Sequence, residues 1–383
     1  MYVFLKLFNF YASTCFTMNF KSNFLYIVAS LFLLSSCAVT KKSKNPTLKF
    51  HFLDEYVIPA ETYFNNEEIG GLSGIDFADG KVFLVDDRSS KPIIYEADLQ
   101  VNNQQIDSLV FLRSFNLKET DTSFQLKALD LESIRFQKGN FWLSSEGNIN
   151  AKKNPSIFQI DGQGKFLNEV ELPSYYQVGG KNQPRNNGVF EALSFDLQDS
   201  NLLWTATELP LVEDGKKPFL WNRFTPVRFS QFNITTQQIE EEYVYTLDRV
   251  VKWPLLPFVI NGVTEILAYQ NNQFLVLERA FSAGRGKKSN RVKLFLADFS
   301  EADSSLGLEV LNKDLQVADK ELVLDFKTIR KQLPSKIIDN IEGMCFGPKL
   351  TNGNRSLLLI SDNNFNSFGD QITQLIWLEL IED

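Results

Sequence analysis

The chain has 383 residues, of which 44% are hydrophobic, and a formal net charge of −8 at pH 7. A chain of this kind can bury a sizeable core as one domain if its sequence is repetitive. The mild acidity argues against nucleic-acid binding, which requires a basic face. The only histidine, His51, lies in an apparent strand, so Ser-His-Asp and Cys-His catalysis lack an imidazole where loops converge.

Residues 1–36 have the pattern of a signal peptide. Lys21 supplies a positive region, and the apolar stretch from Phe24 to Leu34 is too short for a comfortable membrane span. The stretch ends in Leu34-Ser-Ser-Cys37, which resembles a bacterial lipobox. This resemblance implies that Cys37 is lipidated and becomes the first mature residue. The alternative is a plain signal peptide or a short anchor.

Met18 would be a more ordinary start than Met1, so residues 1–17 are interpreted as an upstream extension. Residues 37–46 contain the lipidated cysteine and a basic, polar run, and they are expected to form a flexible tether. No acidic run follows Cys37. We therefore expect a lipid-anchored protein of the bacterial cell envelope, on the outer membrane and facing the periplasm.

Residues 47–383 contain a repeated module of strands. A short first strand carries an acid or a serine, and a second, apolar strand ends at another acid. The first-strand residues are Ser73, Glu132, Glu191, Glu265 and Glu342, and the second-strand acids are Asp86, Glu146, Glu208, Glu278 and Asp362. An alternating third strand follows in each repeat, and a fourth strand is visible in four of them.

Four antiparallel strands per repeat are typical of a propeller blade. The sequence therefore predicts an all-β fold, a β-propeller of five to six four-stranded blades. The last repeat ends after its third strand, and the segment from Leu48 to Ile58 resembles the missing fourth strand. We expect this N-terminal strand to close the ring and to cover two open sheet edges. Two longer intervals between repeats contain expected insertions at residues 209–223 and 280–290.

The first strand of a propeller blade lines the central channel, so residues repeated there should meet around the axis. Carboxylates gathered in this way repel one another unless something neutralises them. Oxygen ligands without His or Cys suit Ca²⁺, with Mg²⁺ less favoured. The predicted metal ligands are Glu132, Glu191, Glu265 and Glu342. In the structural alternative, each carboxylate accepts hydrogen bonds from backbone N–H groups of the neighbouring blade.

The second-strand acids should lie in loops at one mouth of the channel. Three arginines, Arg88, Arg279 and Arg285, could clamp a phosphate or carboxylate group in bidentate fashion. The alternative for each arginine is a surface ion pair of little energetic value.

Several motifs resemble the phytase-like, "esterase-like activity of phytase" domain family over roughly Glu67 to Leu380. They are Gly71-Leu-Ser-Gly74, Leu131-Glu-Ser133, Ser144-Ser-Glu-Gly147, Asn187-Gly-Val-Phe-Glu191, Leu277-Glu-Arg279, Asn340-Ile-Glu-Gly343 and Leu359-Ile-Ser-Asp-Asn363. The resemblance implies a β-propeller and the hydrolysis of esters or phosphate esters, by analogy with calcium-dependent propeller phytases.

No Gly-x-Ser-x-Gly nucleophile motif is present, so metal-activated water is the expected route for any hydrolysis. The expected catalytic residues are Glu191, Glu265, Arg88 and Arg279, the substrate is a small anionic ester or phosphoester, and the protein is expected to be a monomer. The alternative function is a non-catalytic propeller that binds a glycan, a metabolite or an envelope protein. A third hypothesis is the hydrolysis of sugar lactones.

Overall fold

The computed structural model describes residues 48–222, 224–366 and 371–382. The predicted signal peptide, Cys37 and the tether lie outside the described residues. Residues 46–383 form one compact unit that contains all the sheets given below. Among the described residues, no helix is both long enough and apolar enough to cross a membrane.

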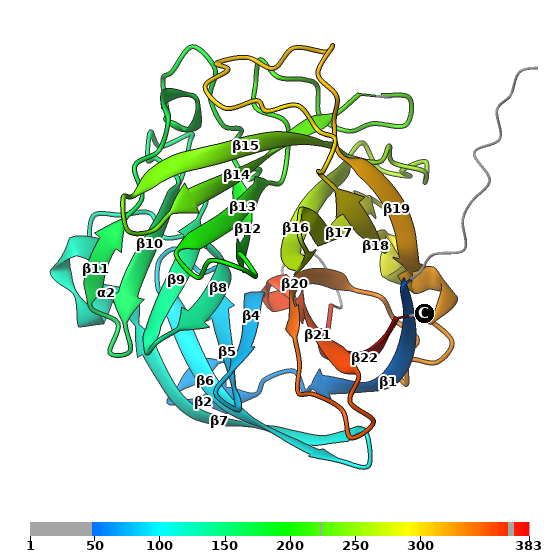
Figure 1. Ribbon diagram of the computed structural model, residues 1–383. Coiled ribbons are helices and arrows are strands. Elements are labelled where there is room, and N and C mark those ends of the chain that lie inside the picture. Colours follow the sequence, from blue (N-terminus) through cyan, green and yellow to red (C-terminus); the bar gives the residue numbers. More distant parts are fainter. Residues whose placement is uncertain (1–47, 223, 367–370, 383) are drawn as a thin grey trace, which may run out of the picture. The chain divides into compact units, whose positions relative to one another are not determined.

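Five four-stranded antiparallel sheets are arranged in a ring within the described part of the chain (Figure 1). Blade 1 comprises β4 (Leu72–Ala78), β5 (Lys81–Asp86), β6 (Ile93–Asn102) and β7 (Gln105–Asn116). Blade 2 comprises β8 (Leu131–Gln137), β9 (Asn140–Ser145), β10 (Ser156–Asp161) and β11 (Phe166–Glu169). Blade 3 comprises β12 (Phe190–Phe195), β13 (Leu202–Thr207), β14 (Pro226–Asn233) and β15 (Gln238–Thr246). Blade 4 comprises β16 (Val259–Gln270), β17 (Gln273–Ser282), β18 (Asn290–Asp298) and β19 (Asp319–Asp325).

Blade 5 is completed by the N-terminal strand, as the sequence predicted. It comprises β20 (Asn340–Phe346), β21 (Arg355–Asp362), β22 (Thr373–Glu382) and β1 (Leu48–Ile58). Strand β1 pairs antiparallel with β22, with Leu48 opposite Glu382 and Ile58 opposite Thr373. The propeller predicted with five to six blades therefore has five in the described residues.

The remaining elements are short. They are the hairpin β2 (Tyr63–Phe64) and β3 (Glu67–Glu68), the helix α2 (Leu117–Thr120), and 3₁₀ turns such as Gly286–Lys288. The expected insertion at residues 209–223 is a connection between β13 and β14. The insertion expected at residues 280–290 is shorter, because β17 continues to Ser282 and β18 begins at Asn290.

The inner strands read as continuous apolar runs because neighbouring blades cover both of their faces. In β21, for example, all four residues of Leu357-Leu-Leu-Ile360 are fully buried. Tight turns join the strands: Asp79 and Gly80, between β4 and β5, both have positive φ values of 51° and 76°. This is the Asp-Gly pattern of a two-residue hairpin turn, whose twist matches that of the strands.

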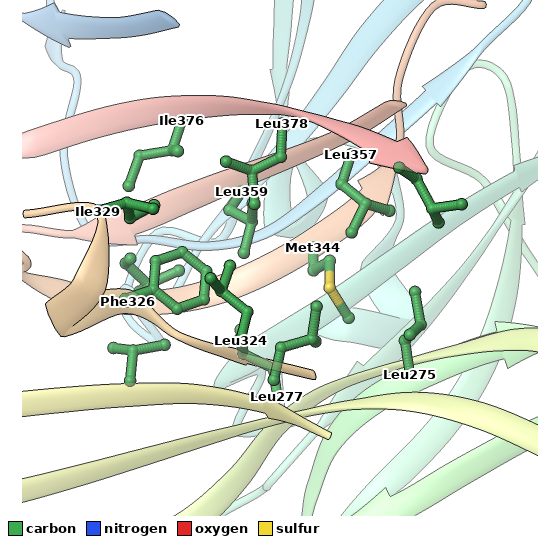
Figure 2. Packing of buried hydrophobic residues seen from close by; sticks show 14 of the residues in the cluster. Leu275, Leu277, Leu324, Phe326, Ile329, Met344, Leu357, Leu359, Ile376 and Leu378 are labelled. Atoms are coloured by element: carbon green, nitrogen blue, oxygen red, sulfur yellow. The ribbon is translucent and has the colours of Figure 1, made fainter. Parts of the chain in front are cut away.

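The core consists of hydrophobic layers between adjacent blades, one layer for each of the five interfaces. Figure 2 shows the layer between blades 4 and 5, in which Leu275 and Leu277 of β17 face Met344 of β20 and Leu357 and Leu359 of β21. Because each blade buries both faces against its neighbours, the ring is stabilised only when it is closed.

Strand direction defines two ends of the ring. Neighbouring strands alternate in direction, so the second strands of all blades end on the same side, which we call the mouth end. The connections from second to third strands and from one blade to the next lie there too. Leu48 pairs with Glu382 at the far end of β22, so β1 begins at the end opposite the mouth.

Candidate functional site

Each first strand contains a β-bulge close to the mouth end. The pairing register with the second strand shifts at this point in all five blades. A bulge redirects the side chain of the extra residue. The extra residues, which we call the inner ring, are Ser73, Glu132, Glu191, Thr264 and Glu342. In blade 2 the shift also includes Ser133.

The structure places Glu265 outside this ring, although the sequence analysis grouped it with the other glutamates. In blade 4 the register shift falls between Val263 and Glu265, so Thr264 takes the inner-ring position. Glu265 is equivalent to Ala192 and Gly343, which directly follow the bulged residue in their blades. Counting from the apolar residue that follows, instead of from the acids, would have revealed this offset in the sequence.

The carboxylate of Glu265 is fully engaged with other blades. It lies 2.9 Å from Nη2 of Arg135 and accepts hydrogen bonds from Ser133 Oγ at 3.0 Å and from the backbone N–H of Leu193 at 3.1 Å. It also accepts one from the N–H of Ile266 at 3.0 Å. Glu265 therefore has the contacts that the structural alternative predicted.

Arg135 closes the axis of the ring behind the inner ring. Its guanidinium donates hydrogen bonds to the carbonyl oxygens of Ile75 at 2.9 Å, Met344 at 3.2 Å and Ile266 at 3.4 Å. These carbonyls belong to blades 1, 5 and 4, and Arg135 itself belongs to blade 2. The Arg135–Glu265 pair thus links the blades across the axis.

A second ring surrounds the mouth at the ends of the second strands. In each blade, the first-strand residue just before the bulge pairs with a residue near the end of the second strand. The pairs are Leu72 with Asp86, Leu131 with Ser145, Phe190 with Thr207, Val263 with Glu278 and Ile341 with Ser361. The next residue of each second strand belongs to what we call the outer ring. Its members are Asp87, Glu146, Glu208, Arg279 and Asp362.

Asp86 and Glu278 were predicted at the mouth but lie one residue away from the outer ring, in contacts of their own. Asp86 accepts hydrogen bonds from Arg88 Nη2 at 2.6 Å and Nε at 3.1 Å. Glu278 accepts from Tyr245 Oη at 2.6 Å and Lys320 Nζ at 2.7 Å.

Arg88 is held by Asp86 and also lies over the Phe365 ring, 4.5 Å from its centroid. Its Nε and Nη2 are therefore already engaged with Asp86, and the anion-binding role expected for Arg88 stays a prediction. His51 contacts Glu379 on the outermost pair of strands of blade 5.

The acids of the two rings lie close enough to perturb one another. Burial raises the pKa of Glu191 well above its usual value, and the charges of Glu146, Glu208 and Glu342 raise it further. The pKa of Glu132 is raised in the same way, by burial first and then by Glu191 and Glu146. Like charges in a low-dielectric site favour the protonated forms, so the cluster resists full ionisation.

Several of these carboxyls titrate near neutrality. Burial raises the pKa of Glu146, Glu208 and Glu342 to about 7. Burial together with Glu146 and Asp87 raises the pKa of Asp130 to about 7 as well. Groups with pKa values near the working pH can exchange protons readily in either direction.

Arg279 is the cation that blade 4 contributes to the outer ring. Its Nη2 lies 3.1 Å from Glu342 and 3.7 Å from Glu208, and both contacts lower the pKa of these carboxyls. Its Nε is buried without a hydrogen-bond partner. The guanidinium thus retains a donor that could receive an anionic oxygen.

Three carboxylates have the spacing of a metal site. Asp130, Glu132 and Glu146 each present one oxygen, and these oxygens lie within 4.8 Å of one another. Hard carboxylate oxygens suit Ca²⁺ or Mg²⁺. A cation there would neutralise charges that burial and mutual repulsion now disfavour, so the donor chemistry fits a divalent metal.

Sequence reasoning found part of this cluster. Glu132, Glu146, Glu191, Glu208, Glu342 and Asp362 were predicted, and the structure brings them together at the mouth with Arg279. Asp87 and Asp130 were not singled out. Asp130 directly precedes β8 and Asp87 directly follows β5, so both lie at the mouth end, where first strands begin and second strands end.

Some solved structures resemble the propeller. A member of the DUF4221 family from Bacteroides vulgatus is 10% identical with a TM-score of 0.38, covering 89% of this chain and 100% of that one. A thermostable family-43 glycoside hydrolase is 10% identical with a TM-score of 0.47, covering 82% and 92%. An endo-arabinase from Bacteroides thetaiotaomicron is 12% identical with a TM-score of 0.43, covering 85% and 96%. At these identities and TM-scores the likeness bears on neither activity nor substrate.

A search of curated proteins returned no match. The family model described as "Phytase-like: Esterase-like activity of phytase" matches residues 67–365, which include the inner strands of every blade and both rings at the mouth. The chain therefore belongs to the phytase-like family, whose resemblance the repeated motifs had indicated.

Proposed function

We propose that this protein is a divalent-cation-dependent hydrolase of small anionic esters or phosphoesters, with its reaction centre at the mouth. The observation that carries the proposal is the charge balance of the two rings and Asp130. Eight carboxyl groups gather there around one guanidinium, that of Arg279, among the described residues. The family description adds an ester-cleaving activity.

Asp130, Glu132 and Glu146 are the residues that would hold the cation, with Ca²⁺ favoured over Mg²⁺ because no rigid octahedral set is evident. A bound divalent ion supplies Lewis-acid polarisation of the substrate oxygen and lowers the pKa of water. The protein itself holds the carboxylate of Glu146 in place. Its Oε1 accepts hydrogen bonds from the backbone N–H groups of Gly188 at 2.5 Å and Val189 at 2.6 Å.

The other ring residues would bind the substrate and move protons. The guanidinium of Arg279, whose side chain is 13% exposed, would orient an anionic oxygen at the mouth. Glu208 and Glu342, with pKa values raised to about 7, accept or donate a proton beside it. Glu191 interacts with residues of both groups: it forms a hydrogen bond with Glu146, and the charge of Glu342 raises its pKa.

The first test is a calorimetric titration of Ca²⁺ into a chain that begins at Ala38, which retains the whole compact unit. Wild type should bind, Glu132→Gln should bind at least about tenfold more weakly, and the exposed Glu301→Gln should bind as wild type does. Failure of wild type to bind Ca²⁺ or Mg²⁺ would overturn the metal-dependent mechanism.

Substrate class is tested next with p-nitrophenyl phosphate, p-nitrophenyl acetate and a sugar lactone, each with calcium and with a chelator. Calcium-dependent turnover of the first two supports the proposal, and turnover of the lactone alone supports lactone hydrolysis. Calcium binding without turnover of any of the three would favour the binding-module alternative.

A further inference from the structure

The mouth end also carries a projecting apolar surface. In the connection from blade 3 to blade 4, Val251, Trp253, Leu255, Leu256 and Phe258 are 51–67% exposed. Trp221, from the connection between β13 and β14, is 64% exposed, and its ring centroid lies 6.3 Å from that of Trp253. We call these six residues the hydrophobic rim. So many exposed apolar side chains in one place indicate an interaction surface.

Backbone hydrogen bonds hold the hydrophobic rim in place. The backbone N–H groups of Leu255 and Leu256 donate to the carbonyl of Ala283 at 2.8 and 3.2 Å, and the N–H of Ala283 donates to Phe258 at 3.0 Å. Arg285 Nε donates to the carbonyl of Trp253 at 2.6 Å. The connection therefore holds its exposed apolar side chains on a hydrogen-bonded backbone.

Positive charge surrounds the rim. Residues 249–258 and 283–292 contain six Lys and Arg residues and no Asp or Glu, in a chain whose net charge is −8. Five of these cations are Arg249, Lys252, Arg285, Lys287 and Lys288; the sixth, Arg291, is paired with Asp325 at 2.7 Å. Burial and the neighbouring charges of Arg330, Arg291 and Arg285 lower the pKa of Lys252 to about 8.

We propose that the hydrophobic rim and its cations form a docking surface for an anionic lipid membrane. Tryptophan and leucine on one surface with Lys and Arg around them are the residues that settle at the interface of a bilayer. Anionic headgroups also complement the cations.

A second copy of this chain fits the rim less well. A two-fold contact would bring the same surface of each copy together, and the cations around each rim would then face each other. Membrane binding by the rim would also be separate from anchoring by the lipid expected on Cys37. The first described strand, β1, begins at the end of the ring opposite the rim.

The test measures binding of the chain that begins at Ala38 to vesicles of phosphatidylcholine, with and without phosphatidylglycerol. We expect sedimentation with the vesicles only when phosphatidylglycerol is present, weakened by added salt. Tryptophan emission should shift to the blue on binding. Trp142, Trp204 and Trp377 are at most 4% exposed, so the shift would report on Trp221 and Trp253.

Paired variants separate the rim from general charge effects. Lys287→Glu/Lys288→Glu should weaken vesicle binding at least about tenfold. Lys152→Glu/Lys153→Glu, an exposed lysine pair at the same end of the ring, should leave it unchanged. Leu255→Ser/Leu256→Ser should abolish binding, whereas Leu197→Ser, which is 53% exposed at the opposite end, should not.

Three results would overturn the proposal, given variants that melt as wild type does. One is the absence of binding to vesicles with phosphatidylglycerol. Another is equal weakening by the rim variants and their controls. The third is a wild-type dimer in sedimentation velocity that Leu255→Ser/Leu256→Ser dissociates, because a second copy would then cover the rim.

Discussion

Arg279 has a different task from every other member of the outer ring. It stands where the other blades place an acid, and it contacts Glu342 and Glu208 with a side chain that is only 13% exposed. A buried guanidinium among carboxyls lowers their pKa values and keeps part of the cluster ionised. It also repels any second cation. Under the proposed function, the charge of Arg279 would therefore affect both the protonation of the mouth and its affinity for a cation.

Replacing Arg279 with glutamine should change cation and substrate binding in opposite directions. Loss of the positive charge removes a repulsion, so Ca²⁺ should bind roughly tenfold more tightly. Loss of the donor should lower kcat/KM for an anionic ester. Calorimetry and steady-state kinetics measure the two effects, and a variant that binds Ca²⁺ more weakly would contradict the assignment of Arg279 as a competing charge.

Glu265 and Glu191 should respond differently to the same substitution. Glu265→Gln removes the carboxylate that lies 2.9 Å from buried Arg135 and leaves Asp76 as the other acid that interacts with it. It should lower the free energy of unfolding by about 3 kcal/mol, without weakening Ca²⁺ binding by the folded protein. Glu191→Gln removes a carboxyl that its neighbours disfavour, so stability should be kept while Ca²⁺ binding weakens. Urea unfolding and calorimetry distinguish the two, and the reverse pattern would place Glu265 at the metal.

At the scale of elements, the sequence was sufficient for the blades and insufficient for the bulges. Apolar runs with intervening turns predicted the strands and the closure of blade 5 by Leu48–Ile58. The bulges were missed because the repeats were aligned on their acids instead of on the apolar residue that follows each bulge. Because strand side chains alternate, an offset of one residue moves Glu265, Asp86 and Glu278 to a different side of the strand.

Removal of β1 should prevent the ring from closing. A chain that begins at Pro59 would leave the edge of β22 unpaired. It would also lack Phe50 and Phe52, and so would uncover the residues of the layer between blades 4 and 5 against which they pack. We expect it to aggregate or to lose cooperative unfolding, because exposed strand edges recruit other chains. Size-exclusion chromatography and thermal melts compare it with a chain that begins at Thr47. A monomeric, cooperatively melting Pro59 chain would show that blade 5 does not need its fourth strand.

At the scale of the whole molecule, the mouth couples stability to pH. Burial raises the pKa of Glu146, Glu208 and Glu342 to about 7 in the folded protein, above the value of an exposed glutamate. Between about pH 4 and pH 7 the native state therefore binds more protons than the unfolded state. Stability is then fully present below the unfolded pKa and falls as the pH rises through the folded values.

Melting in the presence of a chelator should reveal this dependence and its reversal by metal. The melting temperature should fall between about pH 5 and pH 8, and calcium should restore it most at the higher pH, where fewer protons compete for the ligands. Differential scanning calorimetry at both pH values, with and without calcium, measures the effect. Glu132→Gln should reduce the restoration, and a melting temperature that rises with pH in chelator would contradict the raised pKa values.

The Arg135–Glu265 pair has a consequence for the path of substrate and product along the axis of the ring. Because it ties four blades together across the axis, it lies between the mouth and the opposite end of the ring. Under the proposed function, a product formed at the mouth is therefore not expected to leave by the opposite end. The product must return along the route by which the substrate entered, so each should exclude the other, and inhibition by product should be competitive.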